Sequence, residues 1–212
     1  MDNFGDAWGW FSTEVHNLAC EKGWWVLRTA DGPSAGTRSF LECMGLVISE
    51  LGEAVEAFRK PSCSRVILGH SHAAEELADV IIRLADLCEH FGIDPWEFAH
   101  HRIRPELFDP CSIGTKEDIF VYCIDILMDK LSCLDGISRN PIEQIAMISA
   151  YLGEAVLENM NGNGLHVAEG IADAILAICQ LAHQQHIDLG EALVAKHAYN
   201  QSRTYRHGAK LY

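Results

Sequence analysis

The chain has 212 residues, nearly half of them hydrophobic, and a formal net charge of −14 at neutral pH. This length suits one or two modest domains with a real core, and the ordinary charged fraction of 22% argues against disorder. A surface this acidic repels a phosphate backbone, so general nucleic-acid binding is disfavoured. A small phosphate-bearing substrate would need bound cations, and a metal ion is their usual source.

Neither a membrane span nor a secretion signal is predicted. No run reaches the roughly 18 apolar residues of a membrane helix, and the N-terminus lacks the basic-then-apolar order of a signal peptide. Eight cysteines are scattered without a Cys-x-x-Cys pair, several of them inside apolar periodic segments. We therefore expect reduced core thiols in a cytoplasmic protein, with neither a disulfide frame nor a zinc site.

Apolar residues recur at helical spacing along almost the whole chain, whereas strand-like alternation is scarce. Glycine and proline interrupt the pattern between its segments. The sequence therefore predicts an all-α fold, with helices at about residues 6–22, 40–60, 73–92, 95–102, 116–134, 141–160, 166–186 and 189–202.

Part of the sequence repeats. The run Leu-Gly-Glu-Ala-Val at 51–55 recurs at 152–156, and Leu-Ala-Asp at 77–79 recurs as Ile-Ala-Asp at 171–173. Two helix pairs that cannot each bury their apolar faces are expected to pack together as a bundle. We expect a fused pseudo-dimer.

The proline-containing segment 104–110 is the natural joint between the two copies. This predicts a first repeat over residues 1–108 and a second repeat, with a C-terminal tail, over residues 109–212. Such a pseudo-dimer either stays a monomer or pairs again into a homodimer, and the sequence leaves both open.

Four acidic side chains are the main candidates for chemistry. Glu50 and Glu53 are three residues apart and lie side by side on one expected helix, and Glu76 and Asp79 have the same spacing on the next. The first pair alone also fits a solvated helix face. The second helix, however, is apolar around most of its circumference, so its acids are costly to bury without compensating cations. Facing each other, the pairs form a cage of hard oxygen ligands that suits Mg²⁺ or Mn²⁺.

The motif Glu50-x-x-Glu53 followed by Glu76-x-x-Asp79 resembles the signature of MazG-like, all-α nucleoside triphosphate pyrophosphohydrolases. The lead-in helix 16–25 is similar to that of phage-type members, and the tail 196–208 is similar to the closing motif of the family. The resemblance implies hydrolysis between the α- and β-phosphates, giving a nucleoside monophosphate and pyrophosphate, in nucleotide-pool control or sanitation. It also implies that the four acids are metal ligands and catalytic residues.

The same resemblance points to substrate-binding residues in the head and the tail. Trp25, in the pair Trp24-Trp25, would stack on a nucleobase and His16 would bond a base or a phosphate, although both also fit plain packing. Arg83 either holds the carboxylates or touches phosphate. The basic tail would grip phosphates, or would complement a helix dipole. The substrate-binding candidates are His16, Lys22, Trp25, Arg83, Lys196, Tyr199, Asn200 and Arg203.

The second copy departs from the pattern. It has Tyr151 where the first copy has Glu50, and Gly170 where the first copy has Glu76, although Glu154 and Asp173 are retained. Two carboxylates are too few for the same cage. We expect this copy to be catalytically inactive and to supply the partner surface and the tail.

Two other classes of protein remain as alternatives. A non-catalytic, nucleotide-binding MazG-like protein would keep the site without turnover. A ferritin-like metal protein needs two Glu-x-x-His motifs, and only the one at Glu97 and His100 is present. The Nudix box is missing. The base and sugar preference stays open.

Overall fold

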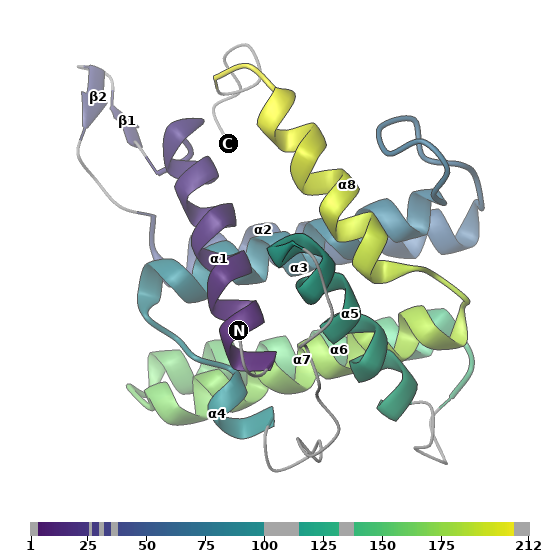
Figure 1. The fold of residues 1–212 in the computed structure, drawn as a ribbon. Helices are drawn as coiled ribbons and strands as arrows, with labels where there is room; N and C mark the ends of the chain where they lie inside the picture. Colours follow the sequence, from purple (N-terminus) through teal and green to yellow (C-terminus); the bar gives the residue numbers. More distant parts are fainter. Residues whose placement is uncertain are drawn as a thin grey trace.

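The computed structural model describes residues 4–25, 27–29, 32–34, 38–99, 115–131 and 138–205. The described chain is predominantly helical, which confirms the all-α class (Figure 1). The observed helices begin within two residues of the expected starts, and the expected ends at 102 and 134 lie outside the described residues. The helices are α1 Phe4–Glu21, α2 Phe40–Arg59, α3 His72–Phe91, α4 Trp96–Ala99, α5 Lys116–Leu131, α6 Pro141–Met160, α7 Gly164–Gln184 and α8 Leu189–Ser202.

One short hairpin was not expected from the sequence. Strands β1 (Leu27–Thr29) and β2 (Gly32–Ser34) pair antiparallel, with Arg28 opposite Pro33. Strands of three residues are too short to show the alternation by which a strand is recognised. The hairpin connects α1 and α2 and lies at the edge of the helical fold (Figure 1).

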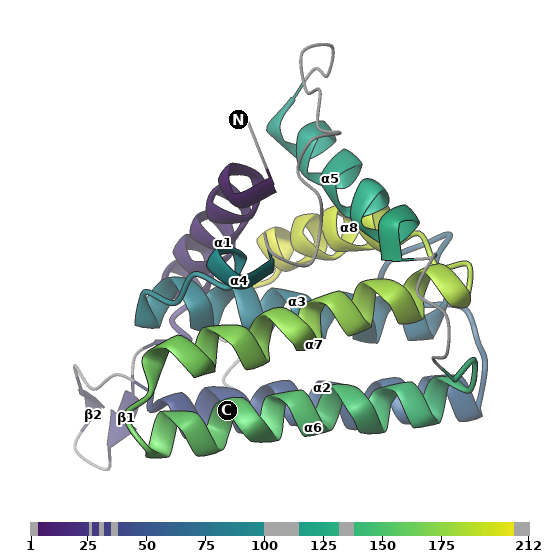
Figure 2. The same cartoon turned by 90° about the horizontal axis from the view of Figure 1, so that it is seen from below.

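Two long helix pairs form the base of the fold. Helix α2 packs on α3 and α6 packs on α7, while α2 also contacts α6 and α3 contacts α7. Figure 2 shows these four helices as two neighbouring rows, with α1, α5 and α8 on the side of α3 and α7. Helix α8, which follows the second pair in the chain, packs on α3 of the first pair. The expected joint at 104–110, and with it the boundary at 108/109, lies outside the described residues.

Local capping sets the ends of the helices that carry the acidic motifs. At the start of α2, Ser39 and Glu42 form a capping box in which each side chain accepts from the other's backbone N–H. Ser71 caps α3 by accepting from the N–H of Ala74 at 3.1 Å. Helix α3 ends at Gly92, whose φ of 63° is the left-handed conformation that glycine adopts without a Cβ clash.

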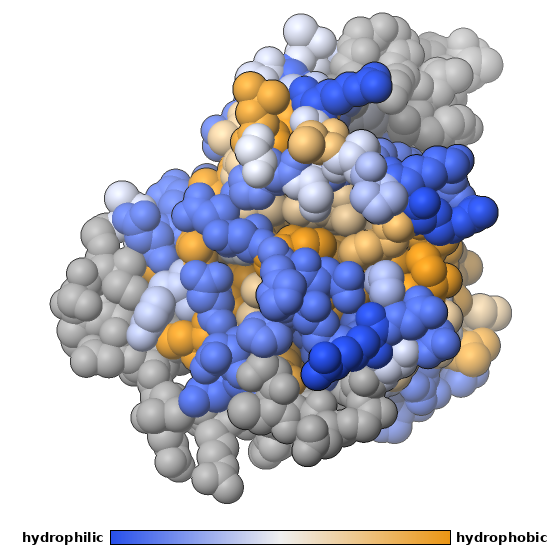
Figure 3. All heavy atoms as spheres, turned by 90° about the vertical axis from the view of Figure 1, so that its right-hand side faces the viewer, coloured by the Kyte–Doolittle hydropathy of each residue, from blue (hydrophilic) through white to orange (hydrophobic). Residues whose placement is uncertain are grey.

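The core is continuous through all the layers and is richest along α3 and α7. Helix α7 is long and apolar enough to cross a membrane by composition, but 78% of its most apolar stretch is buried inside the protein. The six described cysteines are free thiols, four of them buried as expected and two, Cys20 and Cys63, exposed. On the face in Figure 3, hydrophilic side chains surround smaller apolar areas.

Helices α6 and α7 lie close together at Gly170. A Cβ at this position would lie 3.0 Å from the carbonyl oxygen of Tyr151 and 3.1 Å from the Cβ of Ala155. Backbone atoms on the facing helix cannot move aside as the tip of a flexible side chain can. The close packing of this pair therefore requires glycine where the first pair has Glu76.

We predict opposite effects from one substitution at two helical glycines. Gly170→Ala should destabilise the protein by about 1 kcal/mol, because the overpacking cost exceeds the gain in helix propensity. Gly153→Ala in α6, where an added Cβ meets nothing within 4 Å, should stabilise it by about 0.5–1 kcal/mol. Urea unfolding of both variants measures the difference. Equal stabilisation by both would contradict the close approach at Gly170.

Candidate metal centre

A pocket of about 390 Å³ opens between α1, α2, α3 and α8. Acidic side chains from α2 and α3 line one part of it, and aromatic, basic and aliphatic side chains line the rest. Its volume lies within the range of small-molecule sites. Of the residues expected from the sequence, it brings together Glu50, Glu53, Glu76, Asp79, Lys22, Arg83, Lys196, Tyr199, Asn200 and Arg203.

Glu50, Glu53 and Glu76 bring three carboxylates together from α2 and α3. One oxygen from each lies within 4.8 Å of the others. Glu50 and Glu76 are buried whereas Glu53 is exposed, so the group sits at the pocket wall and opens to solvent. We call these three side chains the acidic triad.

Each member of the acidic triad keeps an oxygen that no described side chain occupies. Arg83 Nε donates to Oε1 of Glu50 at 2.5 Å, and His72 Nε2 lies 2.7 Å from Oε1 of Glu76. Both contacts leave the Oε2 atoms unbonded, and within the described ranges Glu53 has no hydrogen-bond partner. Three carboxylate oxygens therefore remain to bind a ligand.

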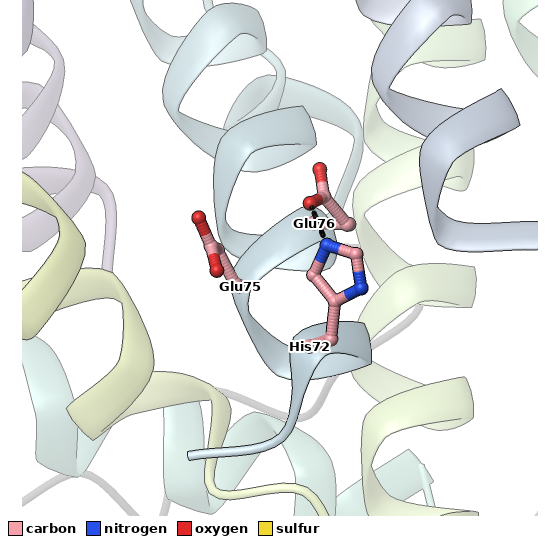
Figure 4. A group of neighbouring side chains, drawn as sticks. All are labelled: His72, Glu75 and Glu76. Atoms are coloured by element: carbon pink, nitrogen blue, oxygen red, sulfur yellow. Dashed lines mark ion pairs between the residues drawn. The ribbon is translucent and has the colours of Figure 1, made fainter. Parts of the chain in front are cut away.

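The fourth expected acid, Asp79, is held differently. Its Oδ2 lies 2.7 Å from the Nζ of Lys196, which comes from α8 and is buried. The same ammonium lies 2.7 Å from Oε1 of Glu75, whose Oε2 accepts from the Oγ of Ser64 at 2.7 Å. Figure 4 shows Glu75 and Glu76 pointing to different sides of α3.

We call the acidic triad together with Glu75 and Asp79 the carboxylate cluster. The pKa values of its members reflect how unevenly positive charge is distributed among them. Burial, with the charges of Asp79 and Glu53, raises the pKa of Glu76 to about 8. Burial also raises the pKa of Asp79 to about 6, against the opposing effect of Lys196. Burial acts in the same direction on Glu75, but its bonds from Lys196 and Ser64 outweigh this and hold its pKa below its usual range. Lys196 therefore compensates Glu75 and Asp79, whereas Arg83 is the arginine or lysine paired with the acidic triad among the described residues, and it bonds Glu50 alone.

The donor set of the acidic triad fits a hard divalent cation. Mg²⁺ and Mn²⁺ take oxygen ligands, and a few carboxylates supplemented by water complete their coordination. A charge of +2 would relieve the repulsion that raises the pKa of Glu76. A second group, His72 with Glu75 and Glu76, also brings ligand atoms within 4.8 Å, but Lys196 and Ser64 already bond both oxygens of its Glu75.

His16 and Trp25 lie just behind the pocket rather than in its wall. His16 Nδ1 lies 2.7 Å from Oδ1 of Asp86, and Trp25 Nε1 donates to the same oxygen at 2.9 Å. The ring of Trp25 stacks on His90 with centroids 3.7 Å apart. Asp86 and Trp24 do line the pocket. Trp24 therefore lines the pocket where Trp25 was expected, and Trp25 instead bonds Asp86.

The C-terminal helix closes the pocket with basic side chains. The ring of Tyr199 lies between Lys196 and Arg203, with its centroid 5.9 Å from Nζ of the first and 5.4 Å from Cζ of the second. Lys22 Nζ donates to the main-chain carbonyl of Gln201 at 2.7 Å. This bond joins the end of α1 to the end of α8.

Gly23 continues this junction between head and tail. Its φ is +79°, and an added Cβ would lie only 2.2 Å from the ring of Tyr205. The chain therefore turns sharply after α1 and leaves room for an aromatic side chain of the tail. The last part of the expected tail, from Arg206 onward, lies outside the described residues.

The second helix pair does not reproduce the acidic triad among its described side chains. Glu154 is exposed on α6, and Gly170 stands where a second glutamate would be needed. Asp173 is partly buried and has a partner of its own. For the ferritin-like alternative, His100 lies outside the described residues, as does the side chain of Glu97.

Glu75, Ser64, His72 and Asp86 were not singled out from the sequence as site residues. Glu75 lies four residues before Asp79 and Asp86 lies seven after it, so both share its helix face. That spacing could have identified them. Ser64 lies in an irregular segment before α3, and no spacing rule connects it to Glu75.

Comparison of the chain with family models, with curated proteins and with solved structures finds no match.

We predict that Mn²⁺ or Mg²⁺ alone stabilises the protein. At about 100 times the dissociation constant, binding to the native state adds about 2.7 kcal/mol. For a chain of this size that raises the melting temperature by roughly 5–10 °C. Glu53→Gln should remove most of this shift because it removes a triad charge, whereas Glu154→Gln should retain it. Differential scanning calorimetry measures the shift, and an equal shift in both variants would place the ion elsewhere.

Proposed function

We propose that this chain is a divalent-metal-dependent nucleoside triphosphate pyrophosphohydrolase of the MazG-like type. The observation that carries the proposal is the meeting of the acidic triad with Lys22, just after α1, and with Lys196 and Arg203, in and just after α8, in one pocket. Carboxylates that hold a cation and side chains that hold phosphates are the two components that phosphoryl-transfer sites share.

The net charge of the chain makes this arrangement informative. A protein with a charge of −14 repels a triphosphate over most of its surface. The pocket nevertheless gathers basic side chains beside its carboxylates, and Arg38 lies over the ring of Trp24 at 5.8 Å. Its basic lining residues are Lys22, Arg38, Arg83, Lys196 and Arg203.

A divalent cation on the acidic triad would offset phosphate charge and polarise the attacking water. The protein's own groups would do the rest. A carboxylate oxygen of the cluster that the cation leaves free would accept a proton from that water. The water oxygen would bond to the α-phosphorus as the bond from that phosphorus to the bridging oxygen breaks. Pyrophosphate would leave with the electron pair, and Lys22 and Arg203 would bind its charge.

The nucleoside would occupy the part of the pocket near Trp24 and Asp86. Asp86 lies seven residues beyond Asp79 on α3, a rise of about 10 Å along the helix. This separation suits a nucleotide whose phosphates reach the acidic triad. The stacked pair of Trp25 and His90 would hold this end of the site in place.

We also propose that the α2–α3 and α6–α7 pairs are two copies of one unit, packed as a MazG-like pseudo-dimer. The sequence repeats and the contacts of α2 with α6 and of α3 with α7 support this. Gly170 supports an inactive second copy, since the close approach of α6 and α7 leaves no room for a glutamate there. The second copy would contribute α8, with Lys196 and Arg203, to the site of the first.

The proposal predicts metal-dependent release of pyrophosphate from a nucleoside triphosphate. A screen of the common ribo- and deoxyribonucleoside triphosphates with Mg²⁺ or Mn²⁺ should identify substrates and give the monophosphate as the second product. Glu53→Gln should lower turnover about 100-fold or more, because the site loses charge stabilisation of the reaction. Excess chelator should stop the reaction completely.

The matched control is Glu154→Gln, at the position of the second copy that corresponds to Glu53. It should leave turnover unchanged, because Glu154 is exposed and belongs to neither group of possible metal ligands among the described residues. Binding of triphosphates with metal but no pyrophosphate release would instead favour a non-catalytic nucleotide-binding protein. Release that persists in excess chelator would refute the proposed chemistry.

A further inference from the structure

Lys196 is placed as a metal ion would be, inside the carboxylate cluster. Its Nζ is buried and lies 2.7 Å from both Glu75 and Asp79. Burial alone would lower the pKa of this ammonium, but the two carboxylates outweigh it and raise the pKa above its usual value. The side chain is therefore firmly charged and is bound on two sides.

The position between Glu75 and Asp79 is one that a second divalent cation would otherwise suit. In two-metal phosphoryl-transfer sites the ions lie about 3.5–4 Å apart and share neighbouring carboxylates. Glu75, Glu76 and Asp79 lie within one helical turn or so of each other on α3, so the cluster has enough oxygens for two ions. Among the described residues, however, the acidic triad is the group in which every member has an oxygen without a side-chain partner.

We infer that Lys196 is a built-in counter-cation that takes the place of a second metal ion, so that the protein binds one divalent cation per chain, on Glu50, Glu53 and Glu76. Asp79 is then held by Lys196 rather than acting as a full member of the metal cage. Because the ammonium comes from α8, the same contact fixes the tail of the chain against α3. This inference rests on the metal centre of the proposed function.

The contacts of Lys196 and Ser64 make a second divalent cation costly to bind at Glu75 and Asp79. A divalent cation at Glu75 and Asp79 would have to displace an ammonium that is already buried and bonded to both carboxylates. It would also have to displace the Ser64 hydroxyl to use the other oxygen of Glu75. Both displacements are needed to bind a cation at Glu75 and Asp79, and neither is needed to bind one at the acidic triad. We therefore expect a single divalent cation per chain.

The test counts Mn²⁺ ions without any nucleotide. The full-length protein is titrated with Mn²⁺ alone, followed by electron paramagnetic resonance and native mass spectrometry. Wild type should bind one ion with an uncoupled spectrum. Lys196→Met, which keeps an unbranched side chain but removes the charge, should bind two ions, with the spin coupling expected of neighbours. Adding Asp79→Asn to Lys196→Met should return the count to one.

Lys22→Met is the matched control. Lys22 also lines the pocket, but its ammonium bonds a main-chain carbonyl, so its loss should leave one ion. Circular dichroism checks that each variant is folded. Two coupled ions in wild type, or one ion in folded Lys196→Met, would overturn the inference while leaving the metal centre standing. Wild type that binds no Mn²⁺ would instead overturn the metal centre itself. If Lys196→Met does not fold, the number of Mn²⁺ ions bound by wild type still tests the inference, because two coupled ions would overturn it.

Discussion

The burial of carboxylates between α2, α3 and α8 is the constraint on which the rest of the site depends. Glu50, Glu75 and Glu76 are buried, and an ionised carboxylate in such a place is strongly unfavourable unless it is paired. The protein compensates them from different elements: Arg83 on α3 itself, Ser64 before it, and Lys196 on α8. The ion pairs of Lys196, in addition to apolar packing, therefore hold α8 on α3. This contact places α8 along the wall of the pocket, beside the carboxylates of α3.

The two helix pairs show how packing decides where such a cluster can exist. Near Gly170, α6 lies so close to α7 that even a methyl group would contact backbone atoms. The corresponding position of the first pair is Glu76, a large and polar side chain that needs both space and partners. A pair of helices cannot satisfy both conditions at the same point. One pair packs closely and the other opens a pocket, although both carry the Leu-Gly-Glu-Ala-Val run.

The fold was easier to predict from the sequence than the pairing of the charges. Helix positions follow from apolar periodicity and from local signals such as the capping box at Ser39 and Glu42, all of which are short-range. The acidic triad could also be predicted, because the spacing of Glu50 and Glu53 places them on one face of a helix and Glu76 lies on the helix that packs against it. The ion pair of Lys196 with Glu75 spans 121 residues, and nothing local distinguishes Lys196 from a basic residue that caps its own helix. The hairpin at Leu27–Thr29 was missed because three residues cannot display a period.

Lys196 and a divalent ion differ in how they can respond to a phosphate ligand. An ammonium on a flexible four-carbon stem can exchange one carboxylate partner for a phosphate oxygen without leaving the site, whereas a metal ion keeps several ligands at once. Asp79 and Glu75 would then be the groups whose charge is freed when a phosphate binds. Their like charges, close together on α3, would oppose that exchange unless the ligand brought its own cation. A cation on the acidic triad, only one turn away, is placed to meet that need. The ammonium of Lys196 and a metal ion would thus together offset the negative charge of the carboxylates and the phosphate. The ammonium comes from α8, and the ligands of the metal ion come from α2 and α3.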